Sequence, residues 1–144
     1  MTIRFRYTKF PPNIYFPVVD LIVTNPATKI PSPAYKAIID SGASGCILHA
    51  SIGEFIGLDI KSGKRLSLKG VTEGGGEQYL HQVILDIEGQ LQILAEVGFS
   101  YDLQYPFGLL GQREFFDVLK ICFDLSRKQF EILPKHRYFN GRRR

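Results

Sequence analysis

Long hydrophobic runs are missing from this sequence. A charge or a proline interrupts every long apolar stretch, so no segment has the length and hydropathy of a membrane span. The amino terminus carries Arg4, Arg6 and Lys9 ahead of two prolines and has no apolar core of a secretory signal. The sequence therefore predicts no membrane segment and no secretory leader, and we expect a protein of the cytoplasm.

Cysteine is also scarce, and the chain has just two, Cys46 and Cys122. They are too few for a disulfide framework and lack the close spacing of a zinc knuckle or a redox motif, so we expect two ordinary buried thiols. His49 and His81 have no partner ligands at metal-binding spacing. We therefore expect no metal site and no other cofactor.

Acidic residues are outnumbered, with 14 Asp and Glu against 18 Lys and Arg, which gives a formal net charge of +4. The excess is confined to residues 134–144, which hold five basic residues and no acid. Subtracting +5 from +4 leaves −1 on residues 1–133. We divide the chain into a domain, 1–133, and a basic tail, 134–144, and interpret the tail as a solvated terminus. Nucleic-acid binding by this tail is our lowest-ranked interpretation.

The remaining composition is typical of one globular domain. Apolar residues make up 44% and charged residues 22% of the 144 residues, which excludes a disordered chain. Short runs of alternating apolar and polar residues, separated by glycine, proline or asparagine, predict an all-β fold. The predicted strands are 18–24, 34–39, 66–68, 83–87, 91–97, 121–125 and 130–132. Two short segments, 50–57 and 112–119, have the apolar spacing of helices.

An acid follows one of the predicted buried strands. The segment 37–45 reads Ala-Ile-Ile-Asp-Ser-Gly-Ala-Ser-Gly, which places Asp40 directly after an apolar run. A buried carboxylate needs hydrogen-bond donors or a shared proton, and Ser41 and Gly42 can supply donors. The alternative is that Asp-Ser-Gly is merely a turn, because all three residue types favour turns.

A second glycine-containing turn lies later in the chain. Leu109, Leu110 and Gly111 precede the second predicted helix, just as the Asp40 segment precedes the first. Between the two turns, three consecutive glycines lie within residues 70–79. That stretch has two interpretations, a flap that closes over a bound peptide or a flexible hairpin tip, and its position between the turns favours the flap.

With these motifs in this order, the sequence resembles the retropepsin-like aspartic proteases over residues 18–133. The match is closer to single-domain cellular and bacterial members than to viral ones. The resemblance implies a closed β-barrel with one or two short helices, assembled as a homodimer. Peptide hydrolysis by carboxylates needs two of them sharing one proton, and Asp40 is the only Asp followed by Ser-Gly or Thr-Gly in this chain. Each subunit would therefore contribute one Asp40 to a shared site.

The resemblance also assigns roles to individual residues. Asp40 is the expected catalytic carboxylate, Ser41 is expected to bond across the dimer, and the Gly42 N–H is expected to stabilise the carboxylate. The expected substrate-binding residues are Ala43, Gly74, Gly75, Gly76, Leu109 and Leu110. From their apolar character alone, the two leucines fit the core better than a pocket.

The sequence departs from the viral pattern at two positions. Viral members commonly have an acid after the Ala and an arginine after the second Gly, whereas this chain has Ser44 and Gln112. The usual ion pair is therefore absent, and the termini, with Pro11 and Pro12, do not obviously interleave as in viral dimers. We expect an aspartic endopeptidase. The main alternative is a catalytically silent module that keeps the fold for dimerisation or peptide binding.

Overall fold

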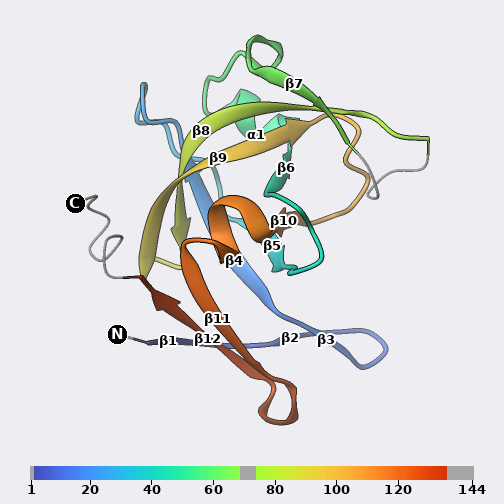
Figure 1. Ribbon diagram of the computed structural model, residues 1–144, viewed down its shortest axis with the longest axis vertical. Helices are drawn as coiled ribbons and strands as arrows, with labels where there is room; N and C mark the ends of the chain where they lie inside the picture. Colours follow the sequence, from blue (N-terminus) through green and yellow to red (C-terminus); the bar gives the residue numbers. More distant parts are fainter. Residues whose placement is uncertain (1, 69–73, 136–144) are drawn as a thin grey trace.

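We describe a computed structural model of the protein over residues 2–68 and 74–135 (Figure 1). Twelve strands and one α-helix are defined in these ranges. The strands are β1 (Ile3–Arg6), β2 (Thr8–Phe10), β3 (Ile14–Phe16), β4 (Val18–Thr24), β5 (Tyr35–Ile39), β6 (Ile47–His49), β7 (Lys64–Ser67), β8 (Glu77–Ile87), β9 (Leu91–Ser100), β10 (Gly108–Leu110), β11 (Leu119–Asp124) and β12 (Gln129–Pro134). The helix is α1 (Ala50–Phe55), and short helical turns are η1 (Ile60–Ser62), η2 (Gln112–Phe116) and η3 (Leu125–Arg127).

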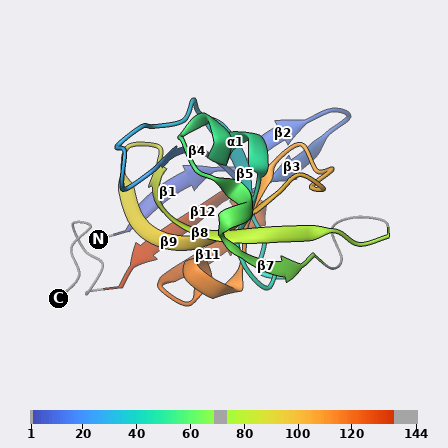
Figure 2. The same ribbon diagram turned by 90° about the horizontal axis from the view of Figure 1, so that it is seen from above.

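A closed β-barrel forms the body of the molecule (Figure 2). Its strands are hydrogen-bonded in the order β4-β5-β10-β6-β9-β8, and β8 pairs back onto β4 to close the ring. Strand β7 pairs with residues 77–80 of β8, whereas β4 pairs with residues 84–87 of that strand. Closure leaves the barrel strands without open edges and buries their inward faces. The predicted all-β barrel is confirmed.

The longest hairpin, β8 and β9, supplies much of the core. Val83, Leu85 and Ile87 alternate with more exposed residues and are fully buried. The turn that follows has positive φ at Glu88 (51°) and Gly89 (71°), the pair of left-handed conformations that a tight hairpin turn needs. The predicted hairpin is confirmed. Its first strand starts at Glu77 instead of residue 83, and its second strand ends at Ser100 instead of residue 97.

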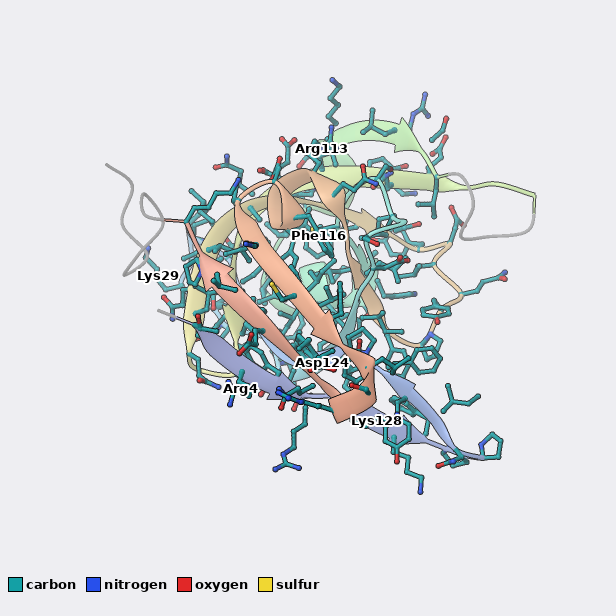
Figure 3. The ribbon with its side chains drawn as sticks, turned by 60° about the horizontal axis from the view of Figure 1, so that its bottom comes forward. Arg4, Lys29, Arg113, Phe116, Asp124 and Lys128 are labelled. Atoms are coloured by element: carbon teal, nitrogen blue, oxygen red, sulfur yellow. The ribbon has the colours of Figure 1, made fainter. Side chains whose placement is uncertain are left out.

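A second sheet joins the two ends of the described chain, in the order β1-β12-β11 (Figure 3). Phe5 of β1 pairs with Phe130 of β12, and their rings stack with centroids 5.3 Å apart. Both rings are buried against the main core. The amino-terminal strand was not predicted from the sequence. Because β12 extends to Pro134, the expected domain boundary at residue 133 lies one residue inside this strand, and residues 136–144 of the basic tail lie outside the described ranges.

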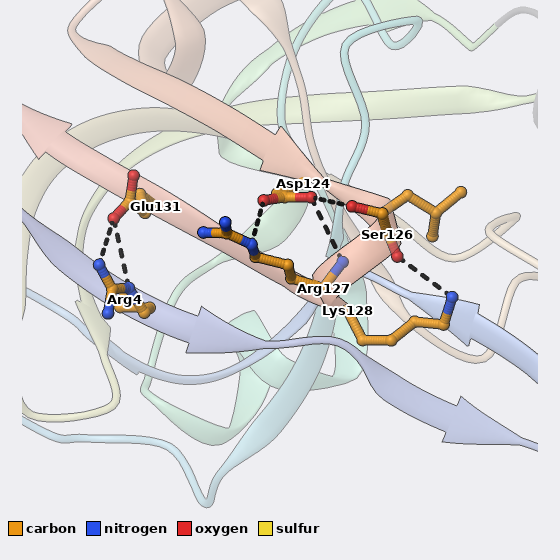
Figure 4. Close-up of polar contacts among 7 residues, drawn as sticks. Arg4, Asp124, Ser126, Arg127, Lys128 and Glu131 are labelled. Carbon is orange, nitrogen blue, oxygen red and sulfur yellow. Dashed lines mark hydrogen bonds and ion pairs between the residues drawn. The ribbon is translucent and has the colours of Figure 1, made fainter.

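Polar contacts stabilise the β11–β12 connection (Figure 4). The Asp124 carboxylate accepts hydrogen bonds from the Ser126 hydroxyl at 2.8 Å and from the Arg127 backbone N–H at 3.3 Å. The hydroxyl bond above all keeps the pKa of Asp124 below its usual value. Arg4 of β1 pairs with Glu131 of β12 at 3.0 Å, which ties the first strand across the sheet.

The two helix predictions have different outcomes. Helix α1 is confirmed within the predicted range 50–57. The predicted helix over 112–119 forms only in part, because the chain makes the short helical turn η2 and then enters β11 at Leu119. Inside that turn Arg113 has an extended ψ of 132° and Glu114 a positive φ of 77°.

Tertiary hydrogen bonds explain why this segment is not a regular helix. The Glu114 carboxylate accepts the backbone N–H of Glu96 at 2.7 Å, and the Asp117 carboxylate accepts the N–H of Glu114 at 2.9 Å. These bonds compensate for the left-handed backbone at Glu114. The predicted apolar side chains still face inward, since Phe115 and Leu119 are buried and Phe116 is half-buried.

The cysteine prediction is half wrong. Cys46 is buried, and burial raises the pKa of its thiol to about 12, but Cys122 is exposed on β11. Outward-facing positions alternate along β11, which is the outer strand of its sheet, and Cys122 occupies one of them. Within the described residues, no helix is long and apolar enough to cross a membrane.

Candidate active site

Strands β5 and β10 place Asp40. The two strands run parallel, with Ile38 opposite Leu109 and Ile39 opposite Leu110, so the two glycine-containing turns leave the sheet at the same end. The ladder continues one residue further, because the Asp40 N–H donates to the Leu110 carbonyl at 2.9 Å. Side chains alternate along a strand, so Asp40 projects from the same face as Ile38.

The Asp40 carboxylate is held by its own loop. The Gly42 N–H donates to its Oδ1 at 2.9 Å, as expected from the sequence. Asp40 is half-buried rather than fully buried, which corrects the expectation of a carboxylate inside the protein. The reason is that the loop turns outward after β5, leaving Ser41 and Gly42 exposed in the single chain.

The second glycine turn is bonded directly to the Asp40 loop. The Gln112 N–H donates to the Ala43 carbonyl at 2.8 Å, and the Arg113 N–H donates to the Ser44 carbonyl at 3.0 Å. The Gln112 side chain adds a third bond, from Nε2 to the Ser41 carbonyl, at 2.8 Å. A neutral amide therefore joins the loops at the position where viral members commonly have an arginine.

Close packing at this junction requires a glycine. A β-carbon added to Gly111 would collide with the carbonyl oxygens of Ala43 and Gly45. Because these are backbone atoms of a loop already held by hydrogen bonds, they cannot move aside cheaply. The two turns predicted to belong to one site are therefore brought together by backbone contacts.

The expected substrate-binding residues are distributed over several environments. Ala43 lies in the Asp40 loop and is half-buried, Leu109 is 5% exposed, and Leu110 is fully buried in the main core. Gly74 and Gly75 have positive φ, and a β-carbon on either would meet no atom within 4 Å.

The β7–β8 hairpin projects from one side of the body of the molecule and has these glycines at its tip (Figure 1). Where this tip joins β8, Gly76 lies against Asp102, whose carboxylate accepts the Glu77 N–H at 3.0 Å. Residues 70–73 of the expected flap lie outside the described ranges. The flap therefore stays a prediction.

The two histidines have structural partners. His49 caps α1, its Nδ1 accepting the Ser51 N–H at 3.0 Å, and His81 Nε2 lies 2.8 Å from the Ile60 carbonyl. In the described part of the chain, no group of three or more His, Cys, Asp or Glu side chains could hold a metal ion.

Two features of this region were missed from the sequence. The bond from Gln112 to Ser41 joins residues 71 positions apart, and no local pattern signals it. The second feature is an apolar cluster in which Phe10, Phe16 and Phe107 pack against Ile38 and Leu109. Alternation in 14–18 offers only a weak strand signal, and Pro11 and Pro12 obscure it.

Comparison with known proteins supports the fold and no more. No protein-family model and no curated protein sequence matches the chain. Among solved structures, a retropepsin-like aspartic protease from Rickettsia conorii matches with a TM-score of 0.63 and 12% identity, covering 92% of this chain and 91% of that chain. EIAV protease, solved with the inhibitor HBY-793, matches with a TM-score of 0.45 and 15% identity over 73% of this chain and 88% of that chain. The chain has the retropepsin-like fold.

Proposed function

We propose that this chain is an aspartic endopeptidase that works as a homodimer, with Asp40 of each subunit in a shared site. The observation that carries the proposal is the placement of Asp40 at the end of the paired β5 and β10 strands, with the Gly42 N–H on its carboxylate. The retropepsin-like fold supports the same assignment.

The chemistry explains why a second copy is required. One Asp40 carboxylate takes a proton from a water molecule, whose oxygen attacks the carbonyl carbon of the scissile peptide bond. The partner carboxyl group donates its proton to the carbonyl oxygen, giving a tetrahedral diol. The first carboxyl group then donates the proton it took to the peptide nitrogen, while the partner carboxylate takes a proton from a hydroxyl of the diol. The carbon–nitrogen bond breaks, and the carboxylic acid and amine products leave.

In this proposal the Gly42 N–H and the exposed Ser41 have supporting roles. The N–H already bonds to one carboxylate oxygen and fixes the orientation of the carboxylate. Ser41 is exposed in the single chain and is proposed to bond across the dimer. Two like charges a few ångströms apart cannot both ionise, so we expect activity at mildly acidic pH, where the pair holds one proton.

Cleavage of a peptide library near pH 5 tests the proposal. We expect Asp40→Asn to lower kcat/KM at least about a hundredfold, the usual size of lost general acid–base catalysis. Asp20→Asn is the matched control, because Asp20 is exposed and its carboxylate forms a surface pair with Lys36 at 3.0 Å. Activity per chain is expected to rise with protein concentration in proportion to the fraction of chains in the dimer, as measured by the mass of the particles in solution.

Two outcomes would contradict the proposal. Cleavage that survives Asp40→Asn would assign the reaction to other residues. A dimer that binds peptides but cleaves none of them between pH 3 and 8 would instead support the catalytically silent module.

A further inference from the structure

The face of the sheet that carries Asp40 has an apolar floor, which we define as Val18, Ile38 and Leu109. These residues lie opposite one another on β4, β5 and β10, outside the main core. They are 4%, 7% and 5% exposed, respectively. Since Ile38 and Asp40 project from the same face, this floor adjoins the carboxylate.

The chain itself covers this floor. Phe10 and Phe16, from the β2–β3 hairpin, pack against it together with Phe107 and Ala43. The Phe10 ring lies 5.3 Å from the Phe107 ring and 5.8 Å from the Phe16 ring, measured between centroids. A peptide side chain could not contact Ile38 or Leu109 while these aromatic rings remain in place.

The covering hairpin is weakly attached to the body. Strands β2 and β3 have three residues each and form a two-stranded sheet of their own, with no ladder to either other sheet in the described chain. Hairpins of this size are marginally stable alone. Besides the floor contacts, Lys128 lies over the Tyr15 ring at 5.1 Å. The hairpin projects on the same side of the body as the β7–β8 hairpin (Figures 1 and 2).

We propose that the β2–β3 hairpin is a built-in cover that competes with peptide side chains for the apolar floor beside Asp40. This inference rests on the proposed function. Phe10 and Phe16 occupy the floor in the resting chain, and an apolar side chain next to the scissile bond takes their place when the hairpin moves away. The two rings therefore set the affinity for substrate without contacting the reacting atoms.

Thiol labelling tests the cover without using activity. In a Cys122→Ser, Asp40→Asn background, Leu109→Cys places a thiol in the floor, while Cys46 stays buried and, with its raised pKa, unreactive. We expect Phe10→Ala with Phe16→Ala to speed labelling of the introduced thiol by maleimide at least about tenfold, because labelling follows the population of the open state. Ile14→Ala is the matched control, since Ile14 is exposed on the same hairpin and outside the cluster.

A milder variant guards against loss of the fold. Tyr15→Leu removes the aromatic partner of Lys128 and keeps both covering phenylalanines, Phe10 and Phe16. We therefore expect faster labelling with a melting temperature close to that of the parent. With Asp40, Leu109 and Cys122 restored, both the Tyr15 variant and the double phenylalanine variant are expected to have lower KM with similar kcat.

The outcomes separate the two proposals. Equal labelling rates in all variants, or slower cleavage when the hairpin is loosened, would overturn the cover and make Phe10 and Phe16 a permanent wall. Faster labelling in chains that never cleave a peptide would support the cover and contradict the protease assignment.

Discussion

At the residue scale, Gln112 has the least expected role in the candidate site. Its side-chain amide donates to the Ser41 carbonyl next to Asp40, and the viral pattern has a charged residue there. A carbonyl oxygen only accepts hydrogen bonds, so the contact requires a donor at this position. The bond from Gln112 to the loop that carries Asp40 thus joins two neutral groups, a side-chain amide and a backbone carbonyl.

Substitutions of Gln112 test this bond through its pH dependence. Gln112→Leu should lower the free energy of unfolding by about 0.5–1.5 kcal/mol at every pH, because the donor is lost. Gln112→Glu can donate only when protonated, so the folded state raises the pKa of the introduced carboxyl group. Its bond is present below the unfolded pKa of about 4.3 and is lost as the pH rises through the folded value.

Urea unfolding at pH 3.5 and pH 7 measures both effects. We expect Gln112→Glu to match the parent at the lower pH and Gln112→Leu at the higher pH. Equal deficits for Gln112→Glu at both values would show that the side chain acts only through packing.

At the element scale, the contact between the two glycine turns fixes the geometry of the site. Gly111→Ala should destabilise the protein by about 1–3 kcal/mol, the usual cost of forcing atoms into a packed region, because its β-carbon meets two backbone carbonyls. Gly45→Ala is the matched control in the facing loop. Its β-carbon would meet only the Arg113 side chain, at 3.9 Å, and Gly45 has no positive φ.

Thermal unfolding of the two variants measures the difference, and peptide cleavage shows whether the site is affected. A Gly111→Ala protein as stable and active as Gly45→Ala would mean that the loops can separate without cost, contrary to the packing described here.

The element that sequence patterning predicted worst is the turn η2. Phe115, Phe116 and Leu119 have helical spacing, yet Leu119 starts a strand and Glu114 has a left-handed backbone. Local spacing predicts which side chains are buried, and two of these three, Phe115 and Leu119, are buried. It cannot report that Glu114 bonds to the backbone of Glu96, which lies 18 residues earlier.

At the scale of the whole molecule, the first and last described strands pair with each other. Strand β12 lies between β1 and β11, so both of its edges are already paired within one chain. Within the described chain, a strand of the proposed second subunit therefore cannot pair with β12 unless β1 or β11 is displaced. How the termini lie in a dimer stays a prediction.

Removal of residues 136–144 tests the division of the chain into domain and tail. The deletion takes away four arginines, Arg137, Arg142, Arg143 and Arg144, and brings the formal net charge from +4 to zero. Strand β12 ends before the cut, so we expect an unchanged melting temperature and unchanged cleavage, with weaker retention on heparin. A lower melting temperature or lost activity would assign the tail a part in the fold or the site.

The sequence by itself determined the fold class, most strands and the Asp40 motif. These are local properties of the chain. Alternation of apolar and polar residues follows from which face of a strand is buried, and turn residues follow from the backbone angles of the turn. Only the tertiary structure decided that Gln112 contacts Ser41 and that Phe10 and Phe16 cover the floor beside Asp40. These contacts join segments that are distant in the chain. The folding of the barrel brings the segments together, and no local sequence pattern predicts which of them meet.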